Sequence, residues 1–364
     1  MRTLDEQQIR DIATGSAVLG TGGGGDPYLG TLDTIQAVRK YGPLSLSTLD
    51  EVPDETLVVS PFAIGSPVPH IERLSLTPEI MRAFAAMSKY FGKPIGAIMP
   101  IEIGGVNSVV PLAVGRTLGL PVLDVDGMGR AYPEIQLITL TLFGHPAAPF
   151  AVADEHGNAA IFDTIDNHWT ERLARPVAVE MGAIAGGVGF PITVADLKVA
   201  GIPGSVSYAE SIGRKIREAQ VSHQDPVQAV LKAANGFQLF AGRIIDVQRR
   251  TEKGWARGEA LIAGGDAWNG HEMVVQFQNE HLVAKLDGEI VASVPDLIAI
   301  LDTERGDPIT TEHLRYGFRV SVIAMPCDPK WRTPEGVALG GPKHFGYDID
   351  YVPIEQRFAS SAQS

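Results

Sequence analysis

The order of strand-like and helical patterns constrains the fold of this chain more than any other feature. Up to about residue 235, short apolar runs alternate with helical patterns, and the run at 94–101 is apolar throughout, as in a buried strand. One helical pattern begins at Thr77 and stops at Gly92, and another follows Asn107 and stops at Gly119. Strand–helix alternation with short connections predicts an α/β fold, in which a mostly parallel sheet is covered on both faces and forms three layers.

After residue 236 the pattern changes to closely spaced turns and short strands, which is typical of a sandwich or barrel, with runs at 243–248, 273–278 and 282–286. We therefore expect two domains, an N-terminal α/β domain over 1–172 and a C-terminal domain over 173–364. The C-terminal domain should contain two helices within 205–234 and a β-barrel-like module at about 237–332.

Two local signals predict helices at particular places. The sequence Thr3-x-x-Glu6 fits a capping box and predicts an amphipathic helix over 4–14. Pro133 is placed to open a helix, which we expect to end at Gly144.

Charge and cysteine content limit the partners of the protein. The chain has 30 Lys and Arg against 43 Asp and Glu, a net charge of −13, which argues against binding to nucleic acids or anionic membranes. Its one cysteine, Cys327, excludes an internal disulfide and a Cys-rich zinc site. Acidic Asp5 and Glu6 argue against a signal peptide, and no uncharged stretch is typical of a membrane span. We expect a cytoplasmic homo-oligomer that acts on a small molecule.

A run of glycines is the first candidate ligand site, comprising Gly22, Gly23, Gly24 and Gly25 and closed by Asp26. Consecutive flexible amides can surround an anion, but a tight turn between two helices explains the run equally well. The run lacks the ending of a P-loop, and a helix precedes it where a dinucleotide fingerprint needs a strand. No nucleotide cofactor is therefore expected.

Acidic residues at two neighbouring strand ends are the second candidate. Glu102 follows the run at 94–101, and Asp124 and Asp126 come at the end of the run at 121–125. Ligands of open parallel sheets bind beyond the carboxyl ends of strands, so these carboxylates could form an acid/base pair at one rim. The same loops offer backbone and side-chain ligands for a substrate: Gly104, Gly105, Asn107 and Arg130. The alternative is that the acids are solvated loop residues and that Arg130 is their salt-bridge partner.

The sequence gives weaker evidence for a metal site or a catalytic nucleophile than for the two candidate sites above. None of the nine histidines has an H-x-H or HExxH spacing. A divalent metal ion bound by the strand-end acids is still an alternative. Cys327 at a strand end is expected to be a packing residue. The polar segment 278–281 is either a solvated hairpin tip, which would expose Glu280, or a loop that reaches over the α/β site.

Several of these segments resemble a bacterial family associated with S-methyl-thiohydantoin desulfurases and with companions of hydantoinase/oxoprolinase proteins. The resemblance is most specific over 102–134, a block that closes with Glu134, and it includes 22–26, 200–205 and 345–348. It implies an α/β domain joined to a β-barrel-like domain, and it adds Glu134 to the candidate substrate-binding residues.

The resemblance also implies a reaction, in which water displaces methanethiol from a sulfur-substituted hydantoin ring during the catabolism of modified histidines. Glu102, Asp124 or Asp126 could be the general base, glycine amides could bind the ring carbonyl, and Arg130 could bind a substrate carboxylate. The alternative is a non-catalytic, ligand-binding partner of a hydantoinase-type enzyme. A phosphate-dependent activity that uses the glycine run is a further alternative.

Overall fold

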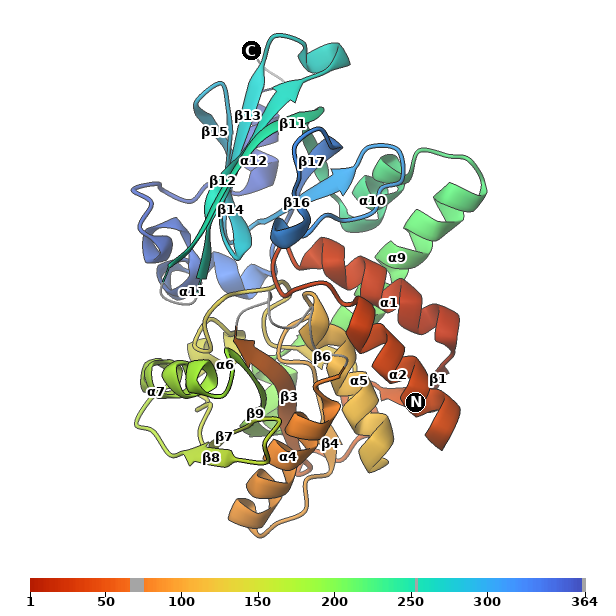
Figure 1. Cartoon of the computed structure of the whole chain (residues 1–364), viewed down its shortest axis with the longest axis vertical. Helices are drawn as coiled ribbons and strands as arrows, with labels where there is room; N and C mark the ends of the chain where they lie inside the picture. The colour runs from red at the N-terminus through yellow and green to blue at the C-terminus, as the bar shows by residue number, and fades with distance from the viewer. Residues whose placement is uncertain (66–74, 253–254, 362–364) are drawn as a thin grey trace.

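The computed structural model describes residues 1–65, 75–252 and 255–361 and divides into two sheet systems (Figure 1). An eight-stranded sheet with flanking helices forms the lower part of the view in Figure 1, and a seven-stranded antiparallel sheet forms the upper part. Among the described residues no helix has the length and apolar character needed to cross a membrane.

The eight-stranded sheet is mixed. Its strand order is β1-β2-β5-β4-β3-β9-β7-β8, with bounds β1 Arg2–Leu4, β2 Leu44–Ser47, β3 Leu57–Gly65, β4 Ala97–Ile98, β5 Val122–Leu123, β7 Phe150–Ala153, β8 Ala159–Phe162 and β9 Ile184–Thr193. The central strands β2, β5, β4 and β3 are parallel, as the alternation predicted. The outer pairs are antiparallel, so the sheet is less uniformly parallel than expected. One cause is the short turn between β7 and β8, because such a connection permits only antiparallel pairing.

Strand β9 crosses from the C-terminal half of the sequence into the middle of this sheet, between β3 and β7. Its glycines allow neighbours to approach closely: a Cβ at Gly187 would lie 2.2 Å from the Phe62 ring, and one at Gly186 would lie 2.4 Å from the Ile80 nitrogen of α4. The division of the chain at about residue 172 stays a prediction, and this strand ties the two halves together.

Helices cover the sheet and connect it to the second part of the molecule; they are α1 Glu6–Leu19, α2 Tyr28–Tyr41, α4 Thr77–Phe91, α5 Val106–Leu118, α6 Thr139–Leu142, α7 Asn167–Glu180, α8 Val194–Ala200, α9 Ser205–Val221 and α10 Pro226–Ala234. Helices α1 and α9 are in close backbone contact, since a Cβ at Gly15 would lie 1.8 Å from the Ala209 oxygen and one at Gly213 would lie 1.9 Å from the Asp11 oxygen.

Two of the predicted helices differ in the structure. The first helix begins at Glu6 rather than residue 4, because the capping box is formed by Asp5 and Gln8, and Thr3 belongs to β1. The prediction of a helix that begins at Pro133 is wrong. The segment after Pro133 folds into turns, and only α6 is helical before Gly144.

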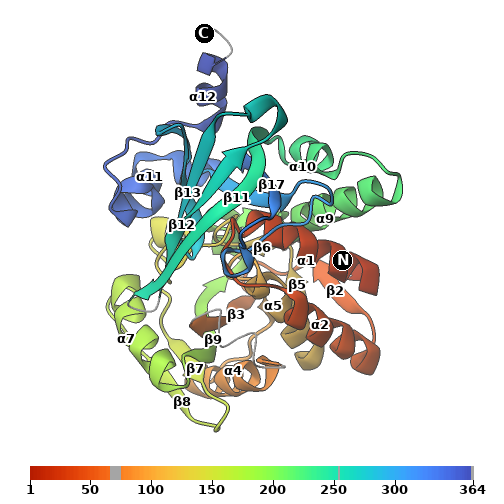
Figure 2. The same ribbon diagram turned by 45° about the horizontal axis from the view of Figure 1, so that its top comes forward.

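The seven-stranded sheet has the order β15-β14-β13-β12-β11-β17-β16 and curls into a half-barrel, which agrees with the separate β module expected from the turn spacing. Its strands are β11 Phe237–Glu252, β12 Trp255–Gly264, β13 Glu272–Gln278, β14 Glu280–Leu286, β15 Glu289–Ser293, β16 Leu297–Asp302 and β17 Arg319–Met325. A small two-stranded sheet pairs β6 (Val125–Asp126) with β10 (Ile202–Pro203). Figure 2 shows the β11–β12 hairpin extending from the half-barrel toward α7.

The C-terminal tail packs against both the half-barrel and the part of the chain that contains the eight-stranded sheet. It contains α11 (Pro334–Gly340) and α12 (Ile354–Ser361). The Gly340 oxygen accepts a hydrogen bond from the Tyr132 hydroxyl at 2.9 Å. Asp296 of the half-barrel accepts hydrogen bonds from the Tyr351 hydroxyl at 3.0 Å and from the Ile354 nitrogen at 2.7 Å. Cys327 is buried, as a packing residue should be, and burial raises the pKa of its thiol to about 12.

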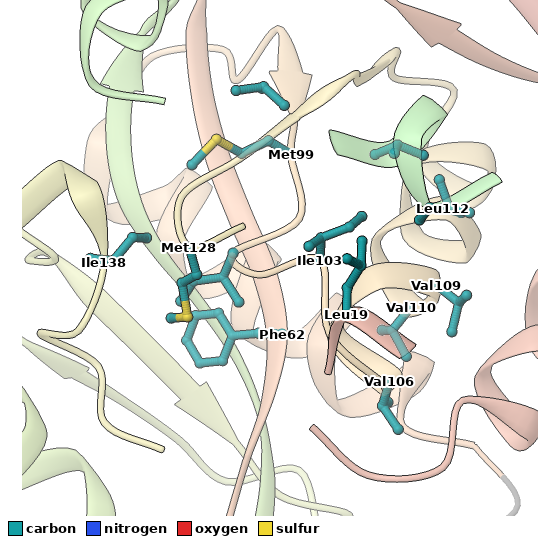
Figure 3. Packing of buried hydrophobic residues seen from close by; sticks show 14 of the residues in the cluster. Leu19, Phe62, Met99, Ile103, Val106, Val109, Val110, Leu112, Met128 and Ile138 are labelled. Carbon is teal, nitrogen blue, oxygen red and sulfur yellow. The ribbon is translucent and has the colours of Figure 1, made fainter. Parts of the chain in front are cut away.

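The apolar core extends beneath the predicted site loops. Figure 3 shows Met128 beside the Phe62 ring and Ile103 near Leu19. These side chains are all buried. The loops after β4 and β6 are therefore anchored by their own apolar residues, which places the polar residues between them in fixed positions.

Candidate functional site

The main candidate site is a cavity of about 110 Å³ where the half-barrel meets the eight-stranded sheet with its flanking helices and loops, which we call the α/β unit. One buried water needs roughly 10–15 Å³ on this measure, so the cavity has room for a small molecule. The α/β unit contributes the loop 23–25, the end of β3, the loop around Glu102, the start of α5 and the segment 132–135. The half-barrel contributes residues 279–280 and 311–312. The site is therefore composite, with walls from both sheet systems.

Glu102 is the strand-end acid that lines the cavity. It is 5% exposed, and its carboxylate accepts hydrogen bonds from the Asn107 side-chain amide at 2.7 Å and from the Tyr132 nitrogen at 3.3 Å. Asn107 is itself fixed, since its side-chain oxygen accepts a bond from the Ala63 nitrogen at 2.7 Å. Burial raises the pKa of Glu102 to about 8, against the smaller lowering effect of these hydrogen bonds. A carboxyl group with such a pKa can accept or release a proton near neutral pH.

The segment 278–281 reaches over the α/β site and is not a solvated hairpin tip. Glu280 is 2% exposed and His281 is fully buried, so the alternative of a solvated tip is wrong and that of a loop over the α/β site is confirmed. The His281 nitrogen donates to the Thr21 oxygen at 2.6 Å, which joins β14 to the loop that precedes the glycines. This docking is long-range, and no local pattern in the sequence signals it.

The glycine run is required by that docking. A Cβ at Gly22 would lie 2.4 Å from the His281 ring, and a Cβ at Gly23 would lie 2.2 Å from a carboxylate oxygen of Glu280. Gly22 also has φ +83°, a conformation that side chains rarely adopt. Gly23, Gly24 and Gly25 line the cavity. The run is thus both a close-packed turn and part of the cavity wall.

Glu280 and His281 have perturbed proton affinities. Burial raises the pKa of Glu280 well above its usual value, and the nearby charge of Glu102 raises it further. Burial lowers the pKa of His281 to about 4, so its ring is neutral at pH 7. The His281 Nδ1 lies 3.0 Å from the Ile298 carbonyl oxygen, which can only accept, so Nδ1 carries the proton.

The structure does not place Asp124, Asp126 or Arg130 on the cavity wall, which corrects the prediction that they line one cleft with Glu102. Strand pairing breaks at Asp124, which accepts hydrogen bonds from the nitrogen and hydroxyl of Ser207 at 3.0 and 2.5 Å. This contact fixes the start of α9. The ends of β4 and β5 therefore do not form one shared edge of the sheet, because the chain after β5 continues as β6, which leaves the large sheet and pairs with β10.

Asp126 and Arg130 are buried residues that stabilise the surrounding loops through hydrogen bonds. One carboxylate oxygen of Asp126 accepts from the nitrogens of Ile103, Met128 and Gly129 at 2.9, 3.0 and 2.7 Å, and burial raises the pKa of this carboxyl to about 7. Arg130 is fully buried and donates to the Pro295 oxygen at 2.7 Å, which links the α/β unit to the half-barrel.

The remaining predicted residues divide between the cavity and its surroundings. Glu134 lines the cavity; although burial opposes it, a hydrogen bond and the charge of His344 hold the pKa of Glu134 below its usual value. Gly104 and Gly105 pack against the glycine run behind the wall, since a Cβ at Gly105 would lie 2.3 Å from the Gly24 oxygen. Asp26 faces a separate groove beside α1 and α2.

Arg175 of α7 is a cavity residue that the sequence did not reveal. Its guanidinium forms an ion pair with Glu171, lies over the Trp255 ring at 3.9 Å and donates to the Pro133 oxygen at 2.9 Å. The contact with Trp255 joins α7 to β12, and Figure 2 shows the end of the β11–β12 hairpin close to α7. An arginine inside a helical pattern gives no local signal of such a role.

Within the described residues, no group of three or more His, Cys, Asp or Glu is arranged to hold a metal ion. The chemistry that this wall offers directly is proton transfer by buried carboxyl groups.

Comparisons with known proteins agree with the two-part architecture. Two family models match the chain, "S-Me-THD-like, N-terminal domain" over residues 7–164 and "S-Me-THD-like, C-terminal domain" over residues 165–354. A crystal structure of a protein from Chromobacterium violaceum superposes with a TM-score of 0.83; it is 22% identical, and the match covers 97% of this chain and 100% of that chain. At this identity the likeness shows the fold alone. No curated protein matches.

Proposed function

The chain belongs to the S-Me-THD-like family, that of S-methyl-thiohydantoin desulfurases, and from this premise we propose that it removes the sulfur substituent of a (S-methyl-)thiohydantoin-type ring by hydrolysis. The products would be a hydantoin and a thiol, methanethiol for an S-methyl substrate. The observation that carries the proposal is Glu102, a buried carboxyl with a pKa of about 8 in a cavity partly walled by glycine backbone.

The proposed chemistry begins at the ring carbon that bears the sulfur. This carbon is electrophilic, and a water molecule attacks it while the Glu102 carboxylate takes a proton from the water. Asn107 keeps the carboxylate in place through its 2.7 Å hydrogen bond. Backbone of the loop 23–25 lies on the same wall and is suited to hold a polar ring atom.

Arg175 takes over the role that the sequence suggested for Arg130. Arg175 lines the cavity and is paired there with Glu171, whereas Arg130 is fully enclosed away from the cavity wall. An anionic substituent on the ring would bind Arg175 in this proposal, since guanidinium groups pair well with carboxylates.

The test is methanethiol release by the purified protein from an S-methyl-thiohydantoin, compared with Glu102→Gln. General acid–base groups contribute about 10²- to 10⁴-fold, so we expect the variant to lose at least about 100-fold in kcat. The matched control is Glu289→Gln, which alters an exposed carboxyl on β15 and should leave turnover unchanged.

Two outcomes contradict the proposal. Equal release by Glu102→Gln and the wild-type protein would exclude Glu102 as the base. Binding of the ring compound without release, by the wild-type protein, would favour a ligand-binding partner of a hydantoinase-type enzyme instead.

A further inference from the structure

We propose that Glu280 of the half-barrel is a second catalytic residue, the proton donor that acts opposite Glu102. This inference rests on the proposed function. Glu280 is the first residue of β14, is 2% exposed and lines the same cavity as Glu102. The two residues come from different sheet systems, so the reacting groups meet only where these systems dock.

The carboxyl group of Glu280, which lines the cavity, has an oxygen without a protein partner among the described residues. Its Oε2 is buried and has no hydrogen-bond partner among the described residues. In Glu102, by contrast, both oxygens accept hydrogen bonds from protein groups. A buried polar atom without a partner costs free energy, so this carboxyl has hydrogen-bonding capacity that the described protein groups do not use.

The backbone around Glu280 is held firmly against the glycine run. The neighbouring His281 nitrogen donates to the Thr21 oxygen at 2.6 Å, and the Glu280 carboxylate occupies the space where a Gly23 Cβ would be. Catalytic groups need such fixed positions, because small displacements reduce rates strongly.

The charged surroundings favour a neutral acid at Glu280 and an ionised base at Glu102. The groups that act on Glu280 are Glu102 and Arg130 from the loops of the α/β unit and Arg175 from α7. Tyr132 and, in the half-barrel, Glu312 line the same cavity. Burial and the negative charge of Glu102 both raise the pKa of Glu280, whereas Arg130 lowers it. Once Glu102 is ionised, Glu280 therefore holds its proton more strongly.

The two carboxyls complete a balanced reaction. During attack, Glu102 takes one proton of water, the new C–O bond forms, and Glu280 gives its proton to the ring nitrogen of the C=N bond. During collapse the C–S bond breaks, and the hydroxyl proton passes to Glu280 as the C=O bond forms. The departing thiolate takes the proton held by Glu102. The products are hydantoin and methanethiol, and both side chains return to their starting states.

The activity test compares Glu280→Gln with the wild-type protein and with the exposed-site control Glu289→Gln. Glutamine keeps the shape but cannot donate the proton, so we expect kcat to fall by at least about 100-fold. The wild-type rate should fall again at alkaline pH as Glu280 ionises, and Glu280→Gln should lack this descending limb. A variant with wild-type kcat, or with an unchanged descending limb, would overturn the proposal.

A second measurement does not depend on activity. Infrared spectra of the unliganded protein should show the C=O band of a protonated carboxylic acid that persists above about pH 8 and is missing in Glu280→Gln. If this band is absent from the wild-type protein, Glu280 is not a buried acid and the proposal fails whatever the activity. If the band is present but no ring compound is hydrolysed, the proposed function fails, and the donor role fails with it.

Discussion

Replacing Glu102 by glutamine should change the pH dependence of folding stability as well as activity. In the unfolded chain this carboxyl ionises near its usual pKa of 4.5, whereas in the folded protein burial raises its pKa to about 8. Between these values the folded state binds a proton that the unfolded state has released. The free energy of unfolding therefore decreases as the pH rises through this window.

The size of the effect follows from the two pKa values. Each pKa unit corresponds to about 1.4 kcal/mol, so ionising Glu102 in its buried position costs the folded protein up to about 5 kcal/mol above pH 8. Glutamine does not ionise. The stability of Glu102→Gln relative to wild type should thus increase by several kcal/mol between about pH 4.5 and about pH 8.5.

Urea unfolding followed by tryptophan fluorescence at both ends of this pH window measures the difference. Trp331 and Trp255 are buried and report the tertiary structure. Titrating groups that do not interact with Glu102 are common to both proteins and cancel in the comparison. Glu289→Gln, on the exposed end of β15, should show no such pH-dependent difference. A Glu102→Gln difference that is constant within about 1 kcal/mol across the window would refute the reasoning.

Two further predictions concern contacts away from the cavity. Gly213→Ala places a methyl group where a Cβ would lie 1.9 Å from the Asp11 oxygen. Moving α9 away from α1 should lower the free energy of unfolding in urea by at least about 1–3 kcal/mol. The control Gly265→Ala should change stability little, because a Cβ there would meet only the Gly242 Cα, at 3.9 Å. Asp124→Asn weakens the contact with Ser207 and should lower the free energy of unfolding by about 1–3 kcal/mol, while the rate of methanethiol release should change less than about threefold. A hundredfold loss of release at unchanged stability would instead indicate that Asp124 is a catalytic residue.

Local patterns in the sequence predicted the parts of the fold that depend on neighbouring residues. The helices α4 and α5 end at Gly92 and Gly119 as expected, because both glycines adopt the left-handed conformation that ends a helix. Glu102 was predicted as a site residue because it follows a buried strand, and it does line the cavity.

The other features depend on contacts between distant segments, which local patterns do not carry. Asp124 and Asp126 come at a strand end in the sequence just as Glu102 does, but neither lines the cavity, and β6, which contains Asp126, pairs with β10 outside the large sheet. For Glu280, the local pattern left open both a solvated hairpin tip and a loop that reaches over the site. Its burial requires the half-barrel to dock on the glycine run.

The position of β9 has a consequence for synthesis of the protein on the ribosome. Strand β3 emerges early, yet one of its partners lies at Ile184–Thr193, more than a hundred residues later. Until that segment leaves the exit tunnel, one side of β3 is an open apolar edge of the kind that pairs with other chains. A nascent chain stalled or cut before residue 184 should therefore depend on a chaperone to stay soluble, and the released fragment should aggregate where the full chain does not.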